Sequence, residues 1–403
     1  MTTAHEAPAQ PAAVGAVGTA TALLEGYRPG DSRFFASPTR TLLAHGVRDE
    51  VPHDSRPLAE RVRATLQRQG ELGDRDPVVV GSVPFDHAAA PELAVPQAVS
   101  WAPALRADPL IALPAPAAGG TAGWRRREVP TAGQYGDAVA DAVQRMQNGE
   151  FGKVVLARTL ELERDAPLDL PAMLQRLARR DPDGYTFAMP TGPGRTLLGA
   201  SPELLVSRRG NAVVANPLAG STPRSDDLAE DVRRAAALLE SAKDLHEHAV
   251  VVAAVRAALS PYCDRLDVPE LPTLVRTATM WHLSTTVTGE LTDTGTSALE
   301  LACALHPTPA VCGTPTGLAR QVIGELEPFD RGHYTGVVGW GNAQGDGEWV
   351  VTIRCAEAAE RRLRLYAGAG VVAASTPEAE TAETAAKFRT FLDAVGGNDD
   401  QHR

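Results

Sequence analysis

Many short stretches of the chain alternate apolar and polar residues with a period of two, which is the pattern of a half-buried β-strand. KVVLARTLE at Lys153–Glu161 is one example. Phe34–Ala44 predicts a β-hairpin, because the segment SPTR divides it with a turn. Further strands are predicted at Pro77–Pro84, Tyr185–Pro190, Arg195–Ala200, Glu203–Arg208, Ala212–Asn216, Leu274–Thr288, Tyr334–Gly341, Glu348–Ala356 and Arg362–Ala367.

Other stretches repeat apolar residues at the helical period. Thr131 can cap one such helix, which runs to about Asn148. Ser375–Thr376–Pro377 opens another, because a hydroxyl can cap the helix and proline suits its first turn. Further helices are predicted at Pro57–Gln69, Leu168–Arg180, Thr296–Leu305 and Gly317–Ile323, with one long helix at Asp226–Leu259.

Runs of adjacent strands interleaved with helices predict an α+β fold with largely antiparallel sheets. Residues 1–20 are rich in alanine and proline, and we expect a disordered N-terminus there. Ala102–Pro130 is rich in proline, alanine and glycine, which indicates an extended connection that crosses the surface.

The composition excludes several classes of function. The chain has 403 residues and a formal net charge of −11, which argues against nucleic acid or an anionic membrane surface as a partner. No apolar run approaches the length of a membrane span. The sequence shows neither a secretion signal nor paired CxxC spacing among its four cysteines, so free thiols in a reducing cytoplasm fit best: Cys263, Cys303, Cys312 and Cys355.

The positive charges are almost all arginine. Of 39 cationic side chains only three are lysine, namely Lys153, Lys243 and Lys387. Arginine stays protonated at any physiological pH, whereas a buried lysine can lose its proton. A chain with this bias is expected to keep lysine where arginine would fail, so the three positions are candidates for chemistry.

Two predicted helices each carry a pair of carboxylates three residues apart, Asp244 with Glu247 and Glu380 with Glu383, so the members of each pair share a face. Two such helices could face one another across a divalent cation. Mg²⁺ suits this arrangement best, because it binds carboxylate and water oxygens. Ordinary surface salt bridges are the alternative. Zinc is not expected at His246 and His248, because alternate residues on a helix point apart.

Three more residues are candidates on physical grounds. Lys153 opens a strand within an apolar run, and a buried lysine can act as a general base. Glu203, directly after a proline, would keep its proton in a pocket of low dielectric and could act as a general acid. Arg354 lies in the apolar strand VVTIRCA, and a buried arginine needs an anion such as a substrate carboxylate. The backbone N–H groups of Asn216–Ser221 and of Gly368 with Gly370 could hold an anion too.

Together these motifs resemble the chorismate-utilising enzymes, and most closely the isochorismate synthases of siderophore biosynthesis. The resemblance covers nearly the whole chain beyond residue 20. It rests on FFASPTRTLLAHG near the N-terminus and then on GKVVLAR, GASPELL, PLAGS, AKDLHEH, MWHL, LHPTPAVCGTP, ELEPFDRGHYTGVVGW, GEWVVTIRCA, AGAG and ETAAK.

The resemblance implies the fold of the anthranilate synthase large subunit, with a two-layered, largely antiparallel β core surrounded by helices. A single chorismate-binding domain would span residues 21–397, with an N-terminal part at 21–107, a catalytic core at 128–397 and a short tail at 398–403. It also implies that the substrate is chorismate, that the cofactor is Mg²⁺, and that the protein works as a monomer without a glutaminase subunit.

The resemblance also implies a role for each site residue. Lys153 would activate the attacking water and Glu203 would protonate the departing C4 hydroxyl. Glu247 and Glu383 would hold Mg²⁺, with Asp244 and Glu380 in supporting positions. Residues expected to contact substrate or line its pocket are Gly220, Ser221, His282, Ala310, Tyr334, Arg354, Gly368 and Lys387.

Three other functions are open. A bifunctional salicylate synthase would go on to eliminate pyruvate from isochorismate. An amine-transferring synthase would need a glutaminase, and such enzymes often carry lysine where this chain has Ala219. A non-catalytic paralogue would be expected to lack an acid, a base or a metal ligand.

The chain departs from the family pattern at two places. Related siderophore enzymes often have glutamate at the position of Ala242 and a Trp-Arg pair at that of Thr381–Ala382.

Overall fold

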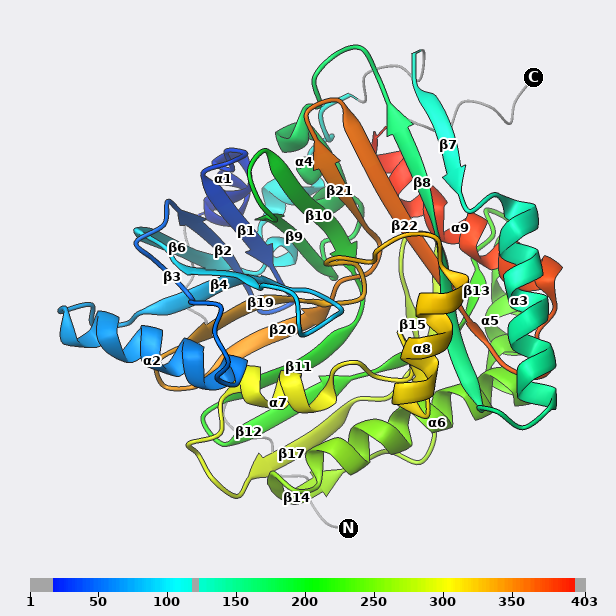
Figure 1. Cartoon of the computed structure of the whole chain (residues 1–403). Coiled ribbons are helices and arrows are strands. Elements are labelled where there is room, and N and C mark those ends of the chain that lie inside the picture. Colours follow the sequence, from blue (N-terminus) through cyan, green and yellow to red (C-terminus); the bar gives the residue numbers. More distant parts are fainter. Residues whose placement is uncertain (1–16, 118–122, 396–403) are drawn as a thin grey trace, which may run out of the picture.

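The computed structural model describes residues 17–117 and 123–395, and among these two large antiparallel β-sheets form the centre of the molecule (Figure 1). The first sheet has ten strands. Their order is β18 (Gly313–Thr314), β8 (Lys153–Glu163), β22 (Arg362–Val371), β21 (Cys355–Ala359), β10 (Arg195–Ser201), β9 (Tyr185–Pro190), β1 (Ser32–Ala36), β2 (Arg40–His45) and β6 (Ala98–Pro103), with β7 (Arg125–Val129) paired to β8.

The second sheet has nine strands and lies against the first. Its order is β14 (Cys263–Asp267), β17 (Val287–Leu291), β12 (Ala212–Asn216), β11 (Leu204–Arg209), β20 (Gly347–Val351), β19 (Val337–Asn342), β4 (Val78–Val83), β5 (Glu92–Val95) and β3 (Asp49–Glu50). A small third sheet has the order β13 (Leu218–Pro223), β16 (Met280–Ser284) and β15 (Thr273–Arg276).

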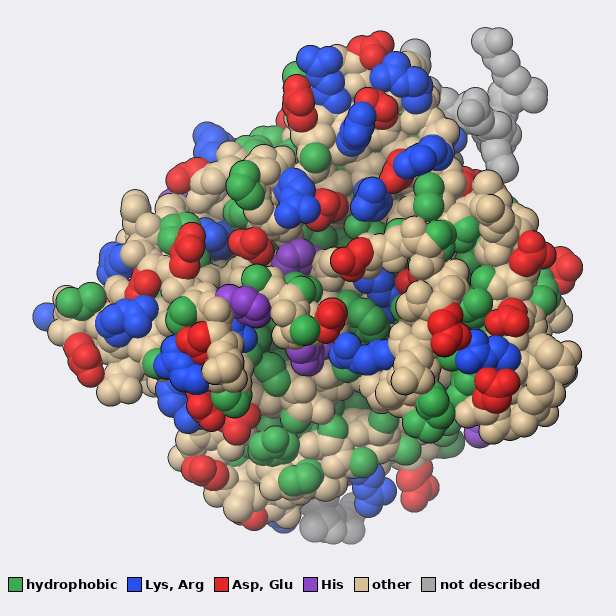
Figure 2. Space-filling view, in the orientation of Figure 1, with side chains coloured by type: hydrophobic (Ala, Val, Ile, Leu, Met, Phe, Trp, Pro, Cys, Tyr) green, Lys and Arg blue, Asp and Glu red, His purple; other side chains and the backbone are tan. Residues whose placement is uncertain are grey.

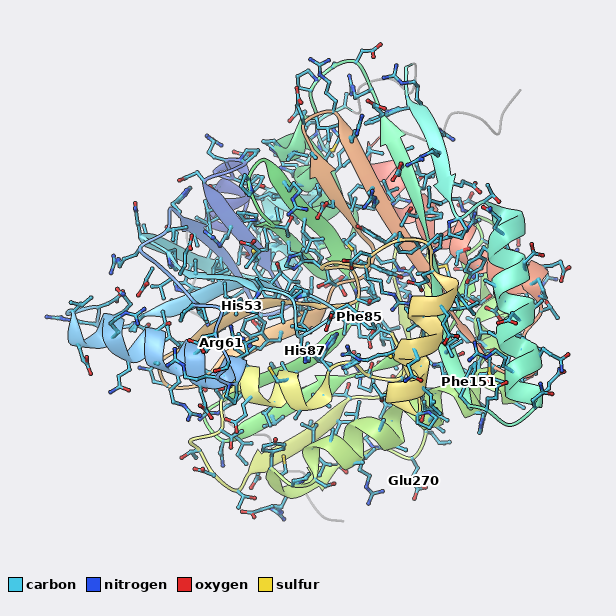
Figure 3. All side chains as sticks on the ribbon, viewed as in Figure 1. His53, Arg61, Phe85, His87, Phe151 and Glu270 are labelled. Atoms are coloured by element: carbon cyan, nitrogen blue, oxygen red, sulfur yellow. The ribbon has the colours of Figure 1, made fainter. Side chains whose placement is uncertain are left out.

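Apolar side chains fill the space between the two large sheets and on their outer faces (Figure 3). In the inner core, Phe35 and Phe187 of the first sheet share a cluster with Val80 and Trp340 of the second. Helices bury their apolar faces on the outside: α1 (Thr19–Glu25), α4 (Leu170–Arg180) and α9 (Pro377–Val395) on the first sheet, α2 (Leu58–Glu71), α6 (Ala242–Leu259) and α7 (Ala298–Leu305) on the second, and α3 (Ala132–Gln147) and α8 (Thr316–Leu326) against β8. The predicted two-layered α+β fold is thereby confirmed.

Three predicted elements are interrupted in the structure, and one of them, the strand predicted at Glu348–Ala356, is divided into β20 and β21. The helix predicted at Asp226–Leu259 is two helices, α5 (Leu228–Glu240) and α6, with Ser241 between them. The Ser241 hydroxyl caps α6 by accepting a hydrogen bond from the Asp244 N–H. The strand predicted at Leu274–Thr288 spans β15, β16 and the start of β17. A turn closed by the Thr277 N–H and the Met280 carbonyl separates β15 from β16.

The ends and the long connection also differ from expectation. Residues 1–16, which fall in the predicted disordered N-terminus, lie outside the described residues, whereas Thr19 and Ala20 begin α1. The tail at 398–403 lies outside the described residues too. The connection predicted at Ala102–Pro130 contains β7 and two short 3₁₀ helices, at Leu105–Ala107 and Pro109–Ala112, and residues 118–122 of it are not described.

Two further features are the distribution of charge on the surface and the apolar character of the helices. Acidic and basic side chains are interspersed on the face shown in Figure 2. Among the described residues, no helix combines the length and apolar character needed to cross a membrane.

A buried ion pair ties β8 to the loop before β19. Arg331 and Glu327 are each 3% exposed, and two hydrogen bonds of 2.5 and 2.8 Å join them. Arg331 also donates to the carbonyl of Val155 on β8, and Glu327 accepts from the Ala157 N–H. The pair therefore fixes the position of β8 relative to the chain that leads into β19.

We expect Arg331→Met to lower the free energy of unfolding by about 3–5 kcal/mol, because it leaves the buried Glu327 carboxylate without its cation. The double variant Arg331→Met/Glu327→Gln should recover part of this loss, since it removes the uncompensated charge. Urea unfolding of both variants measures the two values. Equal stability of the single and double variants would contradict the argument.

Candidate active site

A cavity lies where β22, β13 and β16 meet α6 and α9. It contains most of the residues that the sequence had indicated, from elements far apart in the chain. Its walls are Val155, Pro202, Glu203, Leu218, Ala219, Gly220, Ser221, Glu247, His282, Ala310, Val311, Tyr334, Thr335, Ile353, Arg354, Tyr366, Ala367, Gly368, Gly370, Glu383 and Lys387.

Lys153 lies beneath one wall of the cavity in an ion pair with Glu247. The Lys153 side chain is 2% exposed, and its ammonium lies 2.8 Å from the Glu247 carboxylate. Burial alone would raise the pKa of Glu247, but the Lys153 ammonium outweighs it and lowers that pKa. A Cβ at position 370 would lie 2.3 Å from the Glu247 carboxylate and 3.1 Å from Lys153 Cε. Glycine at 370 therefore makes room for the pair.

The other two lysines pair with carboxylates of the same cluster. Lys243 lies 3.0 Å from Glu380, which is 1% exposed, and Lys387 lies 2.6 Å from Glu383. Lys387 also donates to the Gly368 carbonyl at 2.7 Å. The three lysines therefore neutralise three of the four carboxylates that the helix pattern placed together.

The four carboxylates of α6 and α9 are not all compensated by the lysines. One oxygen of Glu380 is buried without a hydrogen-bond partner, and burial together with the charge of Glu383 raises the pKa of Glu380. Burial also raises the pKa of Asp244, to which the charges of Glu247 and Glu383 add. A set of carboxylate oxygens whose charges repel one another suits a hard divalent ion. In this conformation, no three His, Cys, Asp or Glu side chains of the described residues converge as a metal site would require.

The two histidines of α6 face different environments. His248 is buried and lies 2.7 Å from the Thr285 hydroxyl, whereas His246 is exposed. The two rings of this HEH segment therefore lie in different surroundings.

Glu203 is a buried carboxyl that keeps its proton up to a pH near 7. It lies between β10 and β11 and is 3% exposed. Burial raises its pKa to about 7, although the Leu218 N–H and the charges of Lys153 and Arg354 act in the opposite direction. A carboxyl of this kind can donate a proton to a departing oxygen.

The pattern VVTIRCA predicts that Arg354 lies within a strand, but in the structure Arg354 lies between two strands. The strand breaks after Val351 and resumes at Cys355, and Arg354 has a backbone φ of 50°. Its guanidinium is buried, one terminal nitrogen has no hydrogen-bond partner, and burial lowers its pKa to about 10. A buried guanidinium with an unused donor at a cavity wall is suited to bind a carboxylate.

His282 lies between Arg354 and Ser221, and these two neighbours determine which ring nitrogen of His282 carries the proton. Its Nε2 lies 3.4 Å from Arg354 Nη2, and its Nδ1 lies 3.0 Å from the Ser221 hydroxyl oxygen. Burial and the Arg354 charge hold the His282 pKa well below its usual range, so the ring is neutral. Because a guanidinium can only donate, Nε2 accepts and Nδ1 donates to Ser221. The Ser221 hydroxyl is then free to donate its own proton into the cavity.

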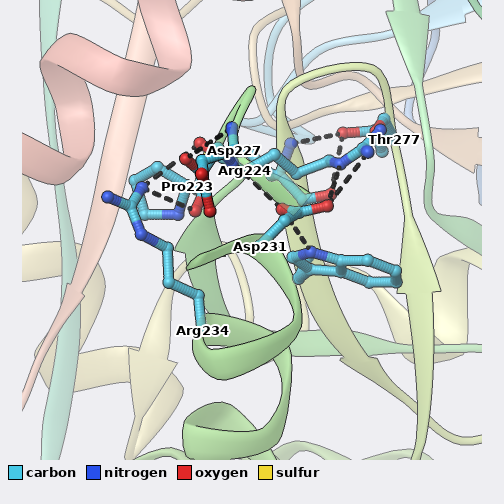
Figure 4. A network of polar contacts seen from close by, with 9 residues as sticks. Pro223, Arg224, Asp227, Asp231, Arg234 and Thr277 are labelled. Atoms are coloured by element: carbon cyan, nitrogen blue, oxygen red, sulfur yellow. Dashed lines mark hydrogen bonds and ion pairs between the residues drawn. The ribbon is translucent and has the colours of Figure 1, made fainter. Parts of the chain in front are cut away.

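A buried carboxylate holds the strands that carry Ser221 and His282 in place. Asp231 of α5 accepts hydrogen bonds from Arg224 at 3.0 Å and from the Trp281 indole at 2.9 Å (Figure 4). Arg224 follows β13, and Trp281 lies on β16. Ser221 of β13 and His282 of β16 are direct partners in the register of these two strands. The network therefore anchors α5 to the two strands of the cavity wall.

The structure brings together most of the predicted site, although three predicted residues do not line the cavity. Lys153, Asp244 and Glu380 lie behind it, each close to a residue of the cluster or wall. Sequence reasoning missed Thr335 and Tyr366. Tyr366 stacks on Tyr334 with ring centroids 4.8 Å apart. Thr335 lies inside the quoted motif ELEPFDRGHYTGVVGW and Tyr366 directly precedes AGAG, and these positions are the local signal for them.

Comparisons with known proteins identify the family of the chain. The family model described as "Chorismate binding enzyme" matches residues 114–396. The chain belongs to this family. It is 53% identical over 385 residues to isochorismate synthase DhbC of Bacillus subtilis (strain 168), covering 93% of this chain and 96% of that protein.

Solved structures show the same fold. DhbC from Bacillus anthracis superposes with a TM-score of 0.89 at 49% identity, covering 94% of this chain and 100% of that chain. Anthranilate synthase component I from Streptococcus pneumoniae TIGR4 superposes with a TM-score of 0.72 at 21% identity, covering 91% of this chain and 93% of that one, and supports the fold alone.

We expect Gly370→Ala to fold normally but to lose at least about 100-fold in kcat/KM, because the added methyl would displace the Glu247 carboxylate and with it the ion pair to Lys153. Gly324→Ala is the matched control, since a Cβ at that position of α8 meets nothing within 4 Å. Circular dichroism and steady-state kinetics compare the two. Full activity of Gly370→Ala would show that this contact is not needed.

Proposed function

We propose that this protein is an isochorismate synthase that converts chorismate to isochorismate with Mg²⁺. The observation that carries the proposal is the cavity itself. It places a protonated carboxyl at Glu203, a guanidinium with an unused donor at Arg354 and a carboxylate cluster backed by Lys153 around one space. Its relative DhbC of Bacillus subtilis, a curated isochorismate synthase with 53% identity, supports the same reaction.

The reaction needs a base and an acid at different ring carbons. Lys153 takes a proton from the water that attacks C2, while Glu203 gives a proton to the C4 hydroxyl, which leaves as water. The ring double bonds shift in between, so one water is consumed and one is released. Separate groups are required because one residue cannot reach both carbons in the same step.

The remaining cavity residues would hold the substrate. Arg354 and the Ser221 hydroxyl donate hydrogen bonds to carboxylate oxygens, and Lys387 adds positive charge. Gly220 and Gly368 contribute backbone at the wall, and a positive φ of 77° at Gly220 lets the chain pass close to Asp244. The walls are completed by His282, Ala310 and Tyr334.

Glu247 and Glu383 would hold the Mg²⁺ ion, with Asp244 and Glu380 in support. Bound there, Mg²⁺ would neutralise these carboxylates and position the carboxylate of the substrate. Glu247 would then no longer depend on the Lys153 ammonium as its counter-ion. Lys153 would then be released from this ion pair and free to reach the attacking water.

We further propose that the product feeds a 2,3-dihydroxybenzoate or salicylate siderophore pathway, and that the protein is a cytoplasmic monomer that needs no glutaminase. The name of a second relative supports the pathway: the vibriobactin-specific isochorismate synthase of Vibrio cholerae, which is 42% identical over 367 residues. The alternative is a bifunctional salicylate synthase, which product analysis separates from the first proposal.

Chromatography of the products is the direct test. Purified protein with chorismate and Mg²⁺ should form isochorismate without pyruvate, and a chelator should abolish the reaction because the carboxylates then lose their cation. Salicylate with an equal amount of pyruvate would instead assign the bifunctional activity. Absence of any product would indicate a non-catalytic paralogue.

Glu203 and Lys153 should control activity in different ways. Glu203→Gln should reduce kcat by about 10²–10⁴-fold because it cannot donate the proton, and Lys153→Ala should abolish turnover, each with an intact fold. Because Glu203 must be protonated and has a pKa of about 7, the rate of the unmodified protein should fall as pH rises through 7. Glu300→Gln, outside the cavity, is the control. Substantial activity of either site variant would remove that residue from its role.

A further inference from the structure

A second cavity lies between the start of α2 and α7 and shares no wall residue with the first. It is formed by the loop before α2, the first turn of that helix and the loop that follows β4. Its walls are His53, Asp54, Ser55, Arg56, Pro57, Leu58, Arg61, Val83, His87, Ala88, Ala89, Pro91 and Cys303. Figure 3 shows His53, Arg61 and His87 near one another in this part of the molecule, and histidine side chains reach the surface there in Figure 2.

Arg61 in this cavity is a buried cation without a carboxylate partner. It is 5% exposed, donates to the Pro52 carbonyl at 2.8 Å and lies 3.4 Å from His53 Nδ1. Its Nε has no hydrogen-bond partner, and no carboxylate of the described residues lies within ion-pair distance. Arg208, equally buried, instead donates to three carbonyls. An unpaired buried guanidinium is costly and is suited to an anion from outside the chain.

The start of α2 adds a second attraction for an anion. Pro57 is the N-cap of this 14-residue helix and provides no side-chain cap, so the positive end of the helix dipole faces the cavity. The nearby carboxylate of Asp54 pairs with Arg56 at 2.6 Å. The hydrogen bonds from Arg56 lower the pKa of Asp54 and the Arg61 charge also lowers it, but among the described residues Asp54 and Arg61 form no ion pair.

We propose that this cavity binds a compact oxyanion, either phosphate or the carboxylate of a small metabolite, through Arg61 and the N-terminus of α2. This assignment does not depend on the proposed function, because it concerns a separate cavity with its own cation.

A chain of two histidines connects this cavity to the active site. His87, on the wall of the second cavity, lies with its Nε2 2.6 Å from His306 Nδ1, and His306 Nε2 lies 2.7 Å from the Thr335 carbonyl. A carbonyl only accepts, so His306 donates through Nε2 and accepts from His87. Thr335, with a φ of 57°, lines the first cavity. If the bound anion moves His87, this chain of contacts would change the affinity of the first cavity, and the effect would be reciprocal.

Isothermal titration of the full chain tests the binding. Inorganic phosphate and succinate are titrated separately in the Arg354→Met background, which removes the main anion contact of the first cavity. Adding Arg61→Met should weaken binding at least about tenfold, whereas adding Arg63→Met, an exposed position on the same helix, should not. The probe that binds tighter identifies the source of the oxyanion. Equal binding with and without Arg61 would overturn the proposal.

Two further measurements keep the proposal testable if Arg61→Met fails to fold. Nitrogen-15 NMR of labelled histidines should show the His53 and His87 resonances shifting with added phosphate, and unchanged resonances would also overturn it. The connection, which does rest on the proposed function, is tested by the KM for chorismate with and without phosphate. KM should change in the unmodified protein but not in His87→Phe. Phosphate binding with unchanged KM would retain the site and overturn the connection.

Discussion

The carboxylates of α6 and α9, of which Glu380 is buried and the others are half-buried, are stable so close together because cations lie among them. Ionised groups removed from water cost several kcal/mol each unless they are paired. Lys153, Lys243 and Lys387 provide this pairing, and they are the only lysines in the sequence. The rest of the site is arranged around this balance: Gly370 makes room for one pair, and the Ser241 hydroxyl bonds to the fourth carboxylate, Asp244.

The two sides of the cavity are built in different ways. On the carboxylate side, helices bring charges together and lysines compensate them. At another part of the wall, Arg354 and His282 are buried, and within the described residues neither forms an ion pair with a carboxylate. The guanidinium donates toward His282, which in turn donates to Ser221. A cavity that combines paired lysines with a guanidinium that has an unused donor is polarised before substrate enters. This preorganisation favours an anionic substrate in one orientation.

Much of this could be predicted from the sequence because the decisive signals are local. Lys153 within an apolar strand, Glu203 after proline and the three-residue spacing of the carboxylates are all visible in short segments. The pairing of each lysine with one carboxylate was not predictable, because it depends on contacts of up to 137 residues' separation. The same holds for Ser221 and His282, which the register of β13 and β16 places opposite each other.

In each wrong prediction, an interaction that the local hydrophobic pattern does not show decides the structure. A single serine within a run of strong helix formers does not show that Asp226–Leu259 contains a break, since capping competes with propensity on nearly equal terms. The apolar pattern around Arg354 hides a positive φ that only tertiary contacts enforce. The strand β7 is exposed and rich in arginine, and forms because β8 offers an edge and the carboxylates of Glu161 and Glu163.

The central claim is that Lys153 and Glu203 act together to add one water at C2 and release another from C4. The most direct measurement is mass spectrometry of isochorismate formed in water enriched in oxygen-18. The account predicts one labelled oxygen in each product molecule, located in the C2 hydroxyl. Isochorismate without label would mean that the hydroxyl migrates within the substrate, and would contradict a site built to activate water.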